Sequence, residues 1–145
     1  MNRPTAILFD FGGTLVSDRQ YDPRSGYARL LDYAIPSSTW TPEEVREEAG
    51  RLDAELEQYY GLIEFPVQKF HRTLFGKLGI QFRLSFSEME LEFWKGAMRY
   101  SPEPEISEVL DELSRLKIKM GVVSNYPFSG SVLEWELQRH GLDAF

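Results

Sequence analysis

The stretch AILFDFGGTL, residues 6 to 15, is the feature that most constrains how this chain can fold. Four apolar residues run into a single carboxylate, Asp10, and the pair Gly12-Gly13 follows. Because glycine costs a helix about 1 kcal/mol per residue, the pattern predicts a strand over residues 5 to 9, covered on both faces as parallel strands are. Open α/β sheets bind ligands at the carboxyl ends of their strands, so we expect Asp10 to lie at such a site.

A second apolar run, residues 117 to 123, ends in Ser124-Asn125 and predicts a second strand parallel to the first. It follows residues 105 to 116, whose apolar stripe has the period of a helix that should lie against the sheet. Adjacent strands in a sheet are about 4.8 Å apart. We therefore expect Asp10 and Ser124-Asn125 to share one edge of the sheet and one ligand.

Between these two strands the patterning is helical. It predicts four helices, over residues 24–34, 42–60, 66–78 and 87–98, and a further helix after the second strand, over residues 131–140. The polar residues 17–23 are expected to form a linker out of the first strand, and the proline-marked residues 99–104 a stiff return.

Local signals predict where several of these helices begin and end. Thr41 with Glu44, and Ser87 with Glu90, have the spacing of capping boxes that begin the second and fourth helices. Gly79 stands at the position where a left-handed residue ends a helix.

The order of these elements predicts an α/β fold in two parts. Residues 1–18 and 99–145 are expected to form an incomplete core around a partial parallel sheet, and residues 19–98 a helical bundle inserted after the first strand. At 145 residues the chain can build one sizeable core and a small subdomain, but not two full domains.

Composition excludes several classes of function. Lys and Arg number 16 against 23 Asp and Glu, and the net charge of −7 argues against a nucleic-acid surface and favours a small molecule as the ligand. The chain has no cysteine, which excludes disulfides and thiolate catalysis and makes the cytoplasm the expected compartment. The N-terminal apolar run is too short to predict a signal peptide or a membrane span.

The first strand end suits phosphoryl transfer. Asp10 can act as a covalent nucleophile that accepts a phosphoryl group as an aspartyl phosphate. The backbone N–H groups of the turn from Phe11 to Thr14, including that of Gly12, can hold the transferring oxygens. Because the ligands are oxygens, a divalent cation such as Mg²⁺ suits this set. The alternative is that Asp10 only caps a turn after a buried strand.

The second strand end offers two further polar groups. The Ser124 hydroxyl and the Asn125 side-chain amide can hold the same oxygens. The alternative is that the pair forms an ordinary turn at the end of a strand. Gly13 and Thr14 are expected to support the turn after Asp10 rather than to contact a ligand.

At these residues the chain resembles the haloacid dehalogenase (HAD) superfamily of hydrolases. The first motif of that family is a hydrophobic strand followed by Asp-x-Asp-Gly-Thr, and the second is a hydrophobic strand ending in Ser or Thr. Here the motifs read ILFDFGGTL from Ile7 and GVVSNY from Gly121. The helical insert lies where members with a helical cap of the first type carry theirs.

The resemblance implies a Rossmann-like parallel core with an inserted helical cap, and a phosphatase-type hydrolase that acts on a small phosphorylated molecule. Carried over position by position, it implies Asp10 as the nucleophile and a Mg²⁺ ligand, with the backbone carbonyl of Gly12 as a second metal ligand. It also implies that Ser124 binds the phosphoryl group and that Asn125 helps to order the site.

Two departures from the family pattern limit what the resemblance implies. The phosphatases of the family carry a second Asp two residues after the nucleophile as general acid and base, and this sequence has Gly12 there. The family's third motif, a Lys, and its fourth, an acidic pair, lie beyond the last residue, Phe145. We hypothesise that these residues are the N-terminal part of a longer protein, or that the chain pairs with another copy or a second polypeptide to complete its sheet.

These residues are compatible with three functions. The first is phosphatase-type hydrolysis through Asp10. The second is a catalytically impaired relative that uses the same pocket for binding or regulation, which Gly12 and the missing motifs favour. The third, hydrolysis of a carbon–halogen bond, is disfavoured because Gly12 lacks the bulk that such members carry after the nucleophile.

Overall fold

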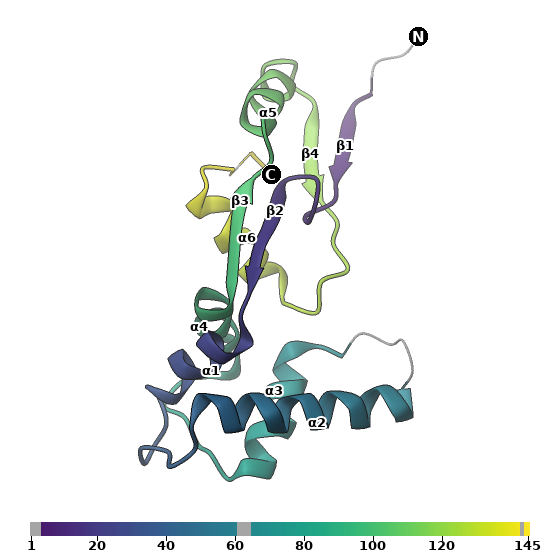
Figure 1. Cartoon of the computed structure of the whole chain (residues 1–145). Helices are drawn as coiled ribbons and strands as arrows, with labels where there is room; N and C mark the ends of the chain where they lie inside the picture. The colour runs from purple at the N-terminus through teal and green to yellow at the C-terminus, as the bar shows by residue number, and fades with distance from the viewer. Residues whose placement is uncertain (1–3, 61–64, 143) are drawn as a thin grey trace. The chain divides into compact units, whose positions relative to one another are not determined.

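The computed structural model of the chain describes residues 4–60, 65–142 and 144–145, apart from the side chains of Arg19, Tyr59 and Tyr60. The chain is a mixed α/β protein made of two compact units (Figure 1). The first unit contains Met1–Arg19 and Arg99–Phe145, and the second contains Gln20–Met98. The division expected from the sequence differs from this one by a single residue at the first boundary.

Strands and helices follow one another along the chain in a fixed order: β1 (Ala6–Phe9), β2 (Val16–Tyr21), α1 (Pro23–Leu31), α2 (Pro42–Tyr60), α3 (Val67–Leu78), α4 (Phe86–Ala97), β3 (Met98–Pro102), α5 (Ile106–Arg115), β4 (Lys119–Val122) and α6 (Gly130–Arg139).

The first unit holds a two-stranded parallel sheet made of β1 and β4. Ala6 pairs with Lys119 at one end and Phe9 pairs with Val122 at the other. The predicted parallel pairing of the two apolar runs is confirmed. Because the strands are parallel and in this register, the residues after Phe9 and after Val122 leave the sheet at the same edge.

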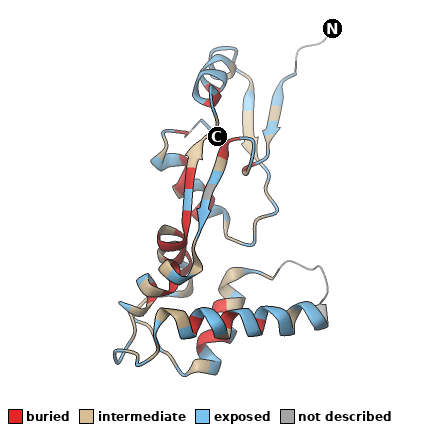
Figure 2. Cartoon of the chain, in the orientation of Figure 1, coloured by how far each residue is buried: buried red, intermediate tan, exposed pale blue. Residues whose placement is uncertain are grey.

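Burial of this sheet differs from the prediction. The apolar run was expected to be covered on both faces, but the Leu8 side chain is 71% exposed and that of Val123 is 59% exposed. Figure 2 shows β1 and β4 without buried positions. Among the described residues β1 pairs with β4 alone, so the strand has too few neighbours to be covered.

The helix expected against the sheet, α5, is only partly buried. Ile106 and Leu110 are buried, whereas the Val109 and Leu116 side chains are 44% and 47% exposed. Only part of the apolar stripe of this helix is therefore buried.

A second sheet corrects the sequence analysis. Residues 17–23 were expected to be a linker and residues 99–104 a proline-marked return, but β2 and β3 pair as a two-stranded antiparallel sheet (Figure 1). Met98 and Tyr100 are buried and Arg99 is exposed, which is the alternation of a strand with one covered face. Pro102 is tolerated because it occupies the last position of β3.

The second unit contains the four predicted helices. Two of the three helix ends predicted from local sequence are confirmed. The Thr41 amide donates to the Glu44 carboxylate at 2.8 Å, and the Glu44 amide donates to the Thr41 hydroxyl at 3.3 Å, so this capping box is confirmed. Gly79 is left-handed as predicted, with φ of 67°, and the Ile80 amide donates to the Phe75 carbonyl.

The predicted start of the fourth helix was wrong by two residues. The capping residue is Ser85, whose hydroxyl accepts from the Glu88 amide, and not Ser87. Glu90, expected to complete the box, is instead buried and accepts a hydrogen bond from Gln68 in α3 at 2.8 Å. Both serines offer a Ser-x-x-Glu pattern, and the packing of α4 on α3 selects the register that buries Glu90.

Two glycines set how closely α1 and α4 pack. A Cβ added at Gly96 would lie 2.8 Å from the Ser25 carbonyl oxygen, and one added at Gly26 would lie 2.6 Å from the Phe93 ring. The core of this unit is built around that crossing from the apolar residues Tyr27, Leu30, Val45, Ala49, Leu52, Leu74, Phe75, Met89, Phe93 and Trp94.

Candidate functional site

The turn after β1 is held by its own backbone. The Phe11 carbonyl accepts hydrogen bonds from the amides of Leu15 and Val16 at 3.0 and 3.2 Å, and the Gly13 amide donates to the Val16 carbonyl at 2.8 Å. Gly13 has φ of 73°, a conformation that costs glycine little and other residues much more. The second glycine of the motif is therefore required by the backbone path of the turn.

A cavity of about 380 Å³ opens beside this turn, within the first unit. It is lined by Asp10, Gly12, Gly13, Ser17, Asp18, Glu103, Asn125 and Tyr126. The carboxyl ends of β1 and β4 thus contribute to one cavity, which is the arrangement that the parallel pairing predicts.

The residues named from the sequence divide between this cavity and its surroundings. Asp10, Gly12, Gly13 and Asn125 line the cavity. Ser124 instead lines a neighbouring cavity of about 390 Å³ that α6 and the C-terminal residues complete. The Ser124 hydroxyl also accepts from the Tyr126 amide at 3.3 Å, a local turn of the kind weighed as the alternative for this residue.

The backbone donors expected in the turn are partly engaged. The Phe11 amide donates to the Asp10 carboxylate at 2.7 Å, and the Gly13 amide is used within the turn. This leaves the amides of Gly12 and Thr14, which make no hydrogen bond to any residue that the structure describes. An anion in the cavity would therefore meet fewer backbone donors than the sequence predicted.

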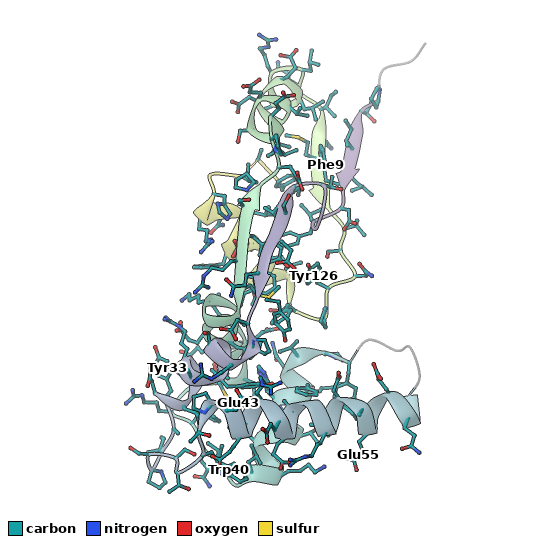
Figure 3. All side chains as sticks on the ribbon, viewed as in Figure 1. Phe9, Tyr33, Trp40, Glu43, Glu55 and Tyr126 are labelled. Carbon is teal, nitrogen blue, oxygen red and sulfur yellow. The ribbon has the colours of Figure 1, made fainter. Side chains whose placement is uncertain are left out.

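Sequence reasoning missed an aromatic cluster at the floor of the site. The Phe11 side chain is fully buried and lies edge-on to Tyr100 and to Tyr126, with ring centroids 5.5 Å away in each case. The hydroxyl oxygens of Tyr100 and Tyr126 are 2.6 Å apart. Tyr126, labelled in Figure 3, is the last residue of the second motif, and its partner Tyr100 lies in β3, where the sequence predicted a return and not a strand.

Tyr126 also occupies the space beside Gly12. A Cβ built on Gly12 would lie 3.3 Å from a ring carbon of Tyr126 and 3.4 Å from its hydroxyl oxygen. These distances are at the tight end of van der Waals contact, so the tyrosine fits against Gly12 because that residue has no side chain.

The lining of the cavity is acidic. Three carboxylates, Asp10, Asp18 and Glu103, are among its lining residues, and none of the lining residues is a Lys, Arg or His. The Ser17 hydroxyl donates to the Glu103 carboxylate. A phosphate ester carries negative charge of its own, so its binding here would require a cation to offset the repulsion.

The cavity offers part of a donor set for Mg²⁺. Carboxylate and carbonyl oxygens are the ligands that this ion prefers. Within residues 4–60, 65–142 and 144–145, however, no three His, Asp or Glu side chains are grouped closely enough to hold a metal. Asp10 and the Gly12 carbonyl would therefore have to be completed by water and by substrate oxygens, which is how Mg²⁺ is often bound.

Comparison with known proteins gives no assignment. Neither a scan against protein-family models nor a search of curated proteins finds a match for this sequence. None of the described helices is both long and apolar enough to cross a membrane.

Proposed function

We propose that this chain carries the phosphoryl-transfer half of a HAD-like hydrolase, in which Asp10 attacks the phosphorus of a small phosphorylated metabolite and forms an aspartyl phosphate. The observation that carries the proposal is the position of Asp10 directly after β1, in one cavity with Asn125 from the end of β4. In this proposal the first unit is the Rossmann-like core, the helical unit is the cap, and the protein works in the cytoplasm.

The chain's own groups have distinct parts in this step. Asp10 supplies the attacking oxygen, and its other interaction, with the Phe11 amide, fixes the carboxylate against the turn. The Gly12 amide and the Asn125 side chain, which both line the cavity, would hold the non-bridging phosphoryl oxygens, because phosphoryl transfer depends chiefly on positioning and charge stabilisation.

We include Mg²⁺ in the proposal as the source of positive charge. The acidic lining of the cavity supports this, since three carboxylates would otherwise repel a phosphate ester. Asp10 and the Gly12 carbonyl are the protein ligands that we assign to it, and bound Mg²⁺ would neutralise charge on the phosphoryl group.

The experiment is to measure Mg²⁺-dependent release of phosphate from p-nitrophenyl phosphate by the wild-type chain and by Asp10→Asn. The expected result is a rate that the substitution abolishes, because the amide of Asn is not a nucleophile of this kind. Asp111→Asn, an exposed carboxylate on α5, is the matched control and should retain the rate. Equal background rates for wild type and Asp10→Asn would reject the hydrolase.

A second candidate is a binding or regulatory relative with impaired catalysis. Gly12 favours it, because a missing general acid costs about 10²- to 10⁴-fold in rate. Binding of inorganic phosphate with Mg²⁺, lost in Asp10→Asn and without turnover of the ester in wild type, would support this candidate over the first.

The exposed sheet favours a partner for the first unit. Leu8 in β1 and Val123, directly after β4, expose apolar side chains, and a two-stranded sheet is rarely stable without further strands or covering helices. We propose that a second copy of the chain, or the remainder of a longer protein, completes it.

A further inference from the structure

We propose that the substrate of this site is the phosphate ester of an amino alcohol, whose primary ammonium group binds to Asp18 and Glu103 while its phosphoryl group lies at Asp10. This inference rests on the proposed function, because it names the substrate class of the same cavity. It is carried by a cavity whose lining comes from two different sheets and has two different chemistries.

The ends of the first sheet form the phosphoryl side of the cavity, and the second sheet forms the other side. Asp10 follows β1 and Asn125 follows the end of β4. Ser17 and Asp18 lie in β2, and Glu103 directly follows β3. The leaving oxygen lies on the far side of phosphorus from the attacking oxygen, because the two are roughly in line. Asp18 and Glu103 are the charged side chains of the lining that remain for the rest of the ester.

Glu103 is held in place through its backbone and its side chain. Its amide donates to the Leu15 carbonyl at 3.0 Å, which ties the residue after β3 to the residue before β2. The Ser17 hydroxyl donates to one oxygen of the carboxylate. The other oxygen accepts no hydrogen bond from any residue that the structure describes, so it is available to a ligand.

Asp18 carries a negative charge that no cation in the described part of the chain offsets. Its side chain is exposed and makes neither a hydrogen bond nor an ion pair with a described residue. Its charge still acts on the floor of the cavity. Burial and the hydrogen bond to Tyr126 raise the pKa of Tyr100, and the charge of Asp18 raises that pKa further.

A metal ion does not account for these two carboxylates. Three carboxylates line the cavity, but among the residues described no three His, Asp or Glu side chains are grouped closely enough to hold a metal. Positive charge bound at Asp10 is balanced by the phosphoryl group, so Asp18 and Glu103 would still repel a leaving group that carries negative charge. A leaving group with a positive charge removes this repulsion and is attracted instead.

Hydrogen bonding favours a primary ammonium over a quaternary one. A primary ammonium has three N–H donors, and the open oxygens of Asp18 and Glu103 are acceptors. Charge-assisted hydrogen bonds of this kind are roughly twice as strong as neutral ones. A trimethylammonium group has no N–H to donate. We therefore expect O-phosphoethanolamine to be preferred over phosphocholine.

The test uses phosphonates, because the proposed reaction does not cleave a carbon–phosphorus bond and binding is then measured apart from turnover. 2-Aminoethylphosphonate and propylphosphonate have the same size and differ by an ammonium against a methyl group. Isothermal titration calorimetry with Mg²⁺ present should give a Kd for 2-aminoethylphosphonate about tenfold or more below that for propylphosphonate. The preference should shrink at high ionic strength, because salt screens charges near the surface.

Two isosteric substitutions remove the charges. In Asp18→Asn with Glu103→Gln, the two Kd values should come within about threefold of one another. Each single variant should lose part of the preference, which keeps the test decisive if the double variant is unstable. Asp111→Asn, at an exposed carboxylate on α5, is the matched control and should retain the full preference.

Turnover separates this inference from the proposed function. We expect kcat/KM for release of phosphate to be about tenfold or more higher for O-phosphoethanolamine than for propyl phosphate. Equal values for the two esters would overturn the substrate class and leave the hydrolase intact. A binding preference that depends on Asp18 and Glu103, with neither ester hydrolysed, would support the substrate class and reject the hydrolase.

Three binding results would also overturn the proposal. Equal Kd values for 2-aminoethylphosphonate and propylphosphonate would show that the site does not recognise the ammonium. A Kd for 2-hydroxyethylphosphonate as low as that for 2-aminoethylphosphonate would show that the site recognises a hydrogen-bond donor and not a charge. A preference that survives in the double variant would assign the ammonium to other residues.

Discussion

Gly96 in α4 lies directly against Ser25 in α1, so that a Cβ on residue 96 would be 2.8 Å from the Ser25 carbonyl oxygen. The neighbouring atoms are backbone and cannot move aside as a flexible side chain would. We predict that Gly96→Ala destabilises the protein by roughly 1 to 3 kcal/mol, because relieving the overlap requires the two helices to separate. Urea unfolding followed by circular dichroism measures the change.

Gly50 in α2 and Gly76 in α3 provide the matched controls. A Cβ at either residue would meet nothing within 4 Å. The same substitution to alanine there should stabilise the protein by up to about 1 kcal/mol, because alanine favours the helix. A Gly96→Ala protein as stable as these two controls would contradict the close crossing of α1 and α4.

The corrected cap of α4 predicts a difference between two nearby serines. Ser85→Ala removes a side chain that accepts from the Glu88 amide and that also donates to the Glu88 carboxylate, at a cost of about 1 kcal/mol. Ser87→Ala changes an exposed residue inside the helix and should leave the free energy of unfolding unchanged or slightly higher. Thermal melts of the two variants distinguish the two caps. A larger loss of stability in Ser87→Ala than in Ser85→Ala would support the cap expected from sequence.

His71 makes the stability of the protein sensitive to acid. Burial lowers the pKa of this imidazole from 6.5 to about 3, and its Nδ1 atom has no hydrogen-bond partner among the residues that the structure describes. Since the unfolded chain binds a proton at a higher pH than the folded one, stability is complete above about pH 6.5 and falls as the pH drops toward 3. The slope from one such group is at most about 1.4 kcal/mol per pH unit.

His71→Phe should remove that slope. The aromatic rings of Tyr27, Phe75 and Phe93 surround the imidazole, so phenylalanine suits the site chemically. Unfolding free energies of both proteins, measured in urea between pH 7 and pH 4, test this prediction. If His71→Phe shows the same slope as wild type, the acid sensitivity comes from other groups.

Tyr100 makes the stability of the protein sensitive to alkali, which is the opposite pH dependence to that of His71. Burial, followed by the hydrogen bond to Tyr126, raises the pKa of Tyr100 above its usual value. The unfolded chain therefore loses this proton first, and the stability that Tyr100 contributes is present below about pH 10 and is lost as the pH rises further. Urea unfolding from about pH 8 to about pH 11 should show a steeper loss for wild type than for Tyr100→Phe.

The exposed sheet predicts self-association. If a second copy covers β1 and β4, sedimentation should show a species of twice 16.8 kDa that dissociates on dilution. Leu8→Lys, at a side chain that is 71% exposed, should weaken it without unfolding the monomer. Monomers at every concentration would contradict completion of the sheet by a second copy.

Several features of the fold were predictable because a short stretch of sequence carries the signal for each element involved. Thr41 and Glu44 cap one another across three residues, and Gly79 ends α3 through the carbonyl of Phe75. The apolar runs of β1 and β4 predicted their parallel pairing, which the structure confirms. Each of these signals is a short local pattern of residue types.

Other features depend on partners that are distant along the chain. The pairing of β2 with β3 could not be read from residues 17–23, whose polar composition is typical of a linker. The choice between Ser85 and Ser87 depends on burying Glu90 against Gln68. The different orientations of Ser124 and Asn125, which line separate cavities, depend on the local turn at Tyr126.

The sequence by itself determined that Asp10 follows a strand and that two glycines let the chain turn behind it, because strand period and glycine conformation are properties of neighbouring residues. Only the tertiary structure decided what stands beside that carboxylate. Tyr126 fits against Gly12 because the parallel register of β1 and β4 brings the two strand ends together, and packing on Phe11 and Tyr100 then fixes the ring.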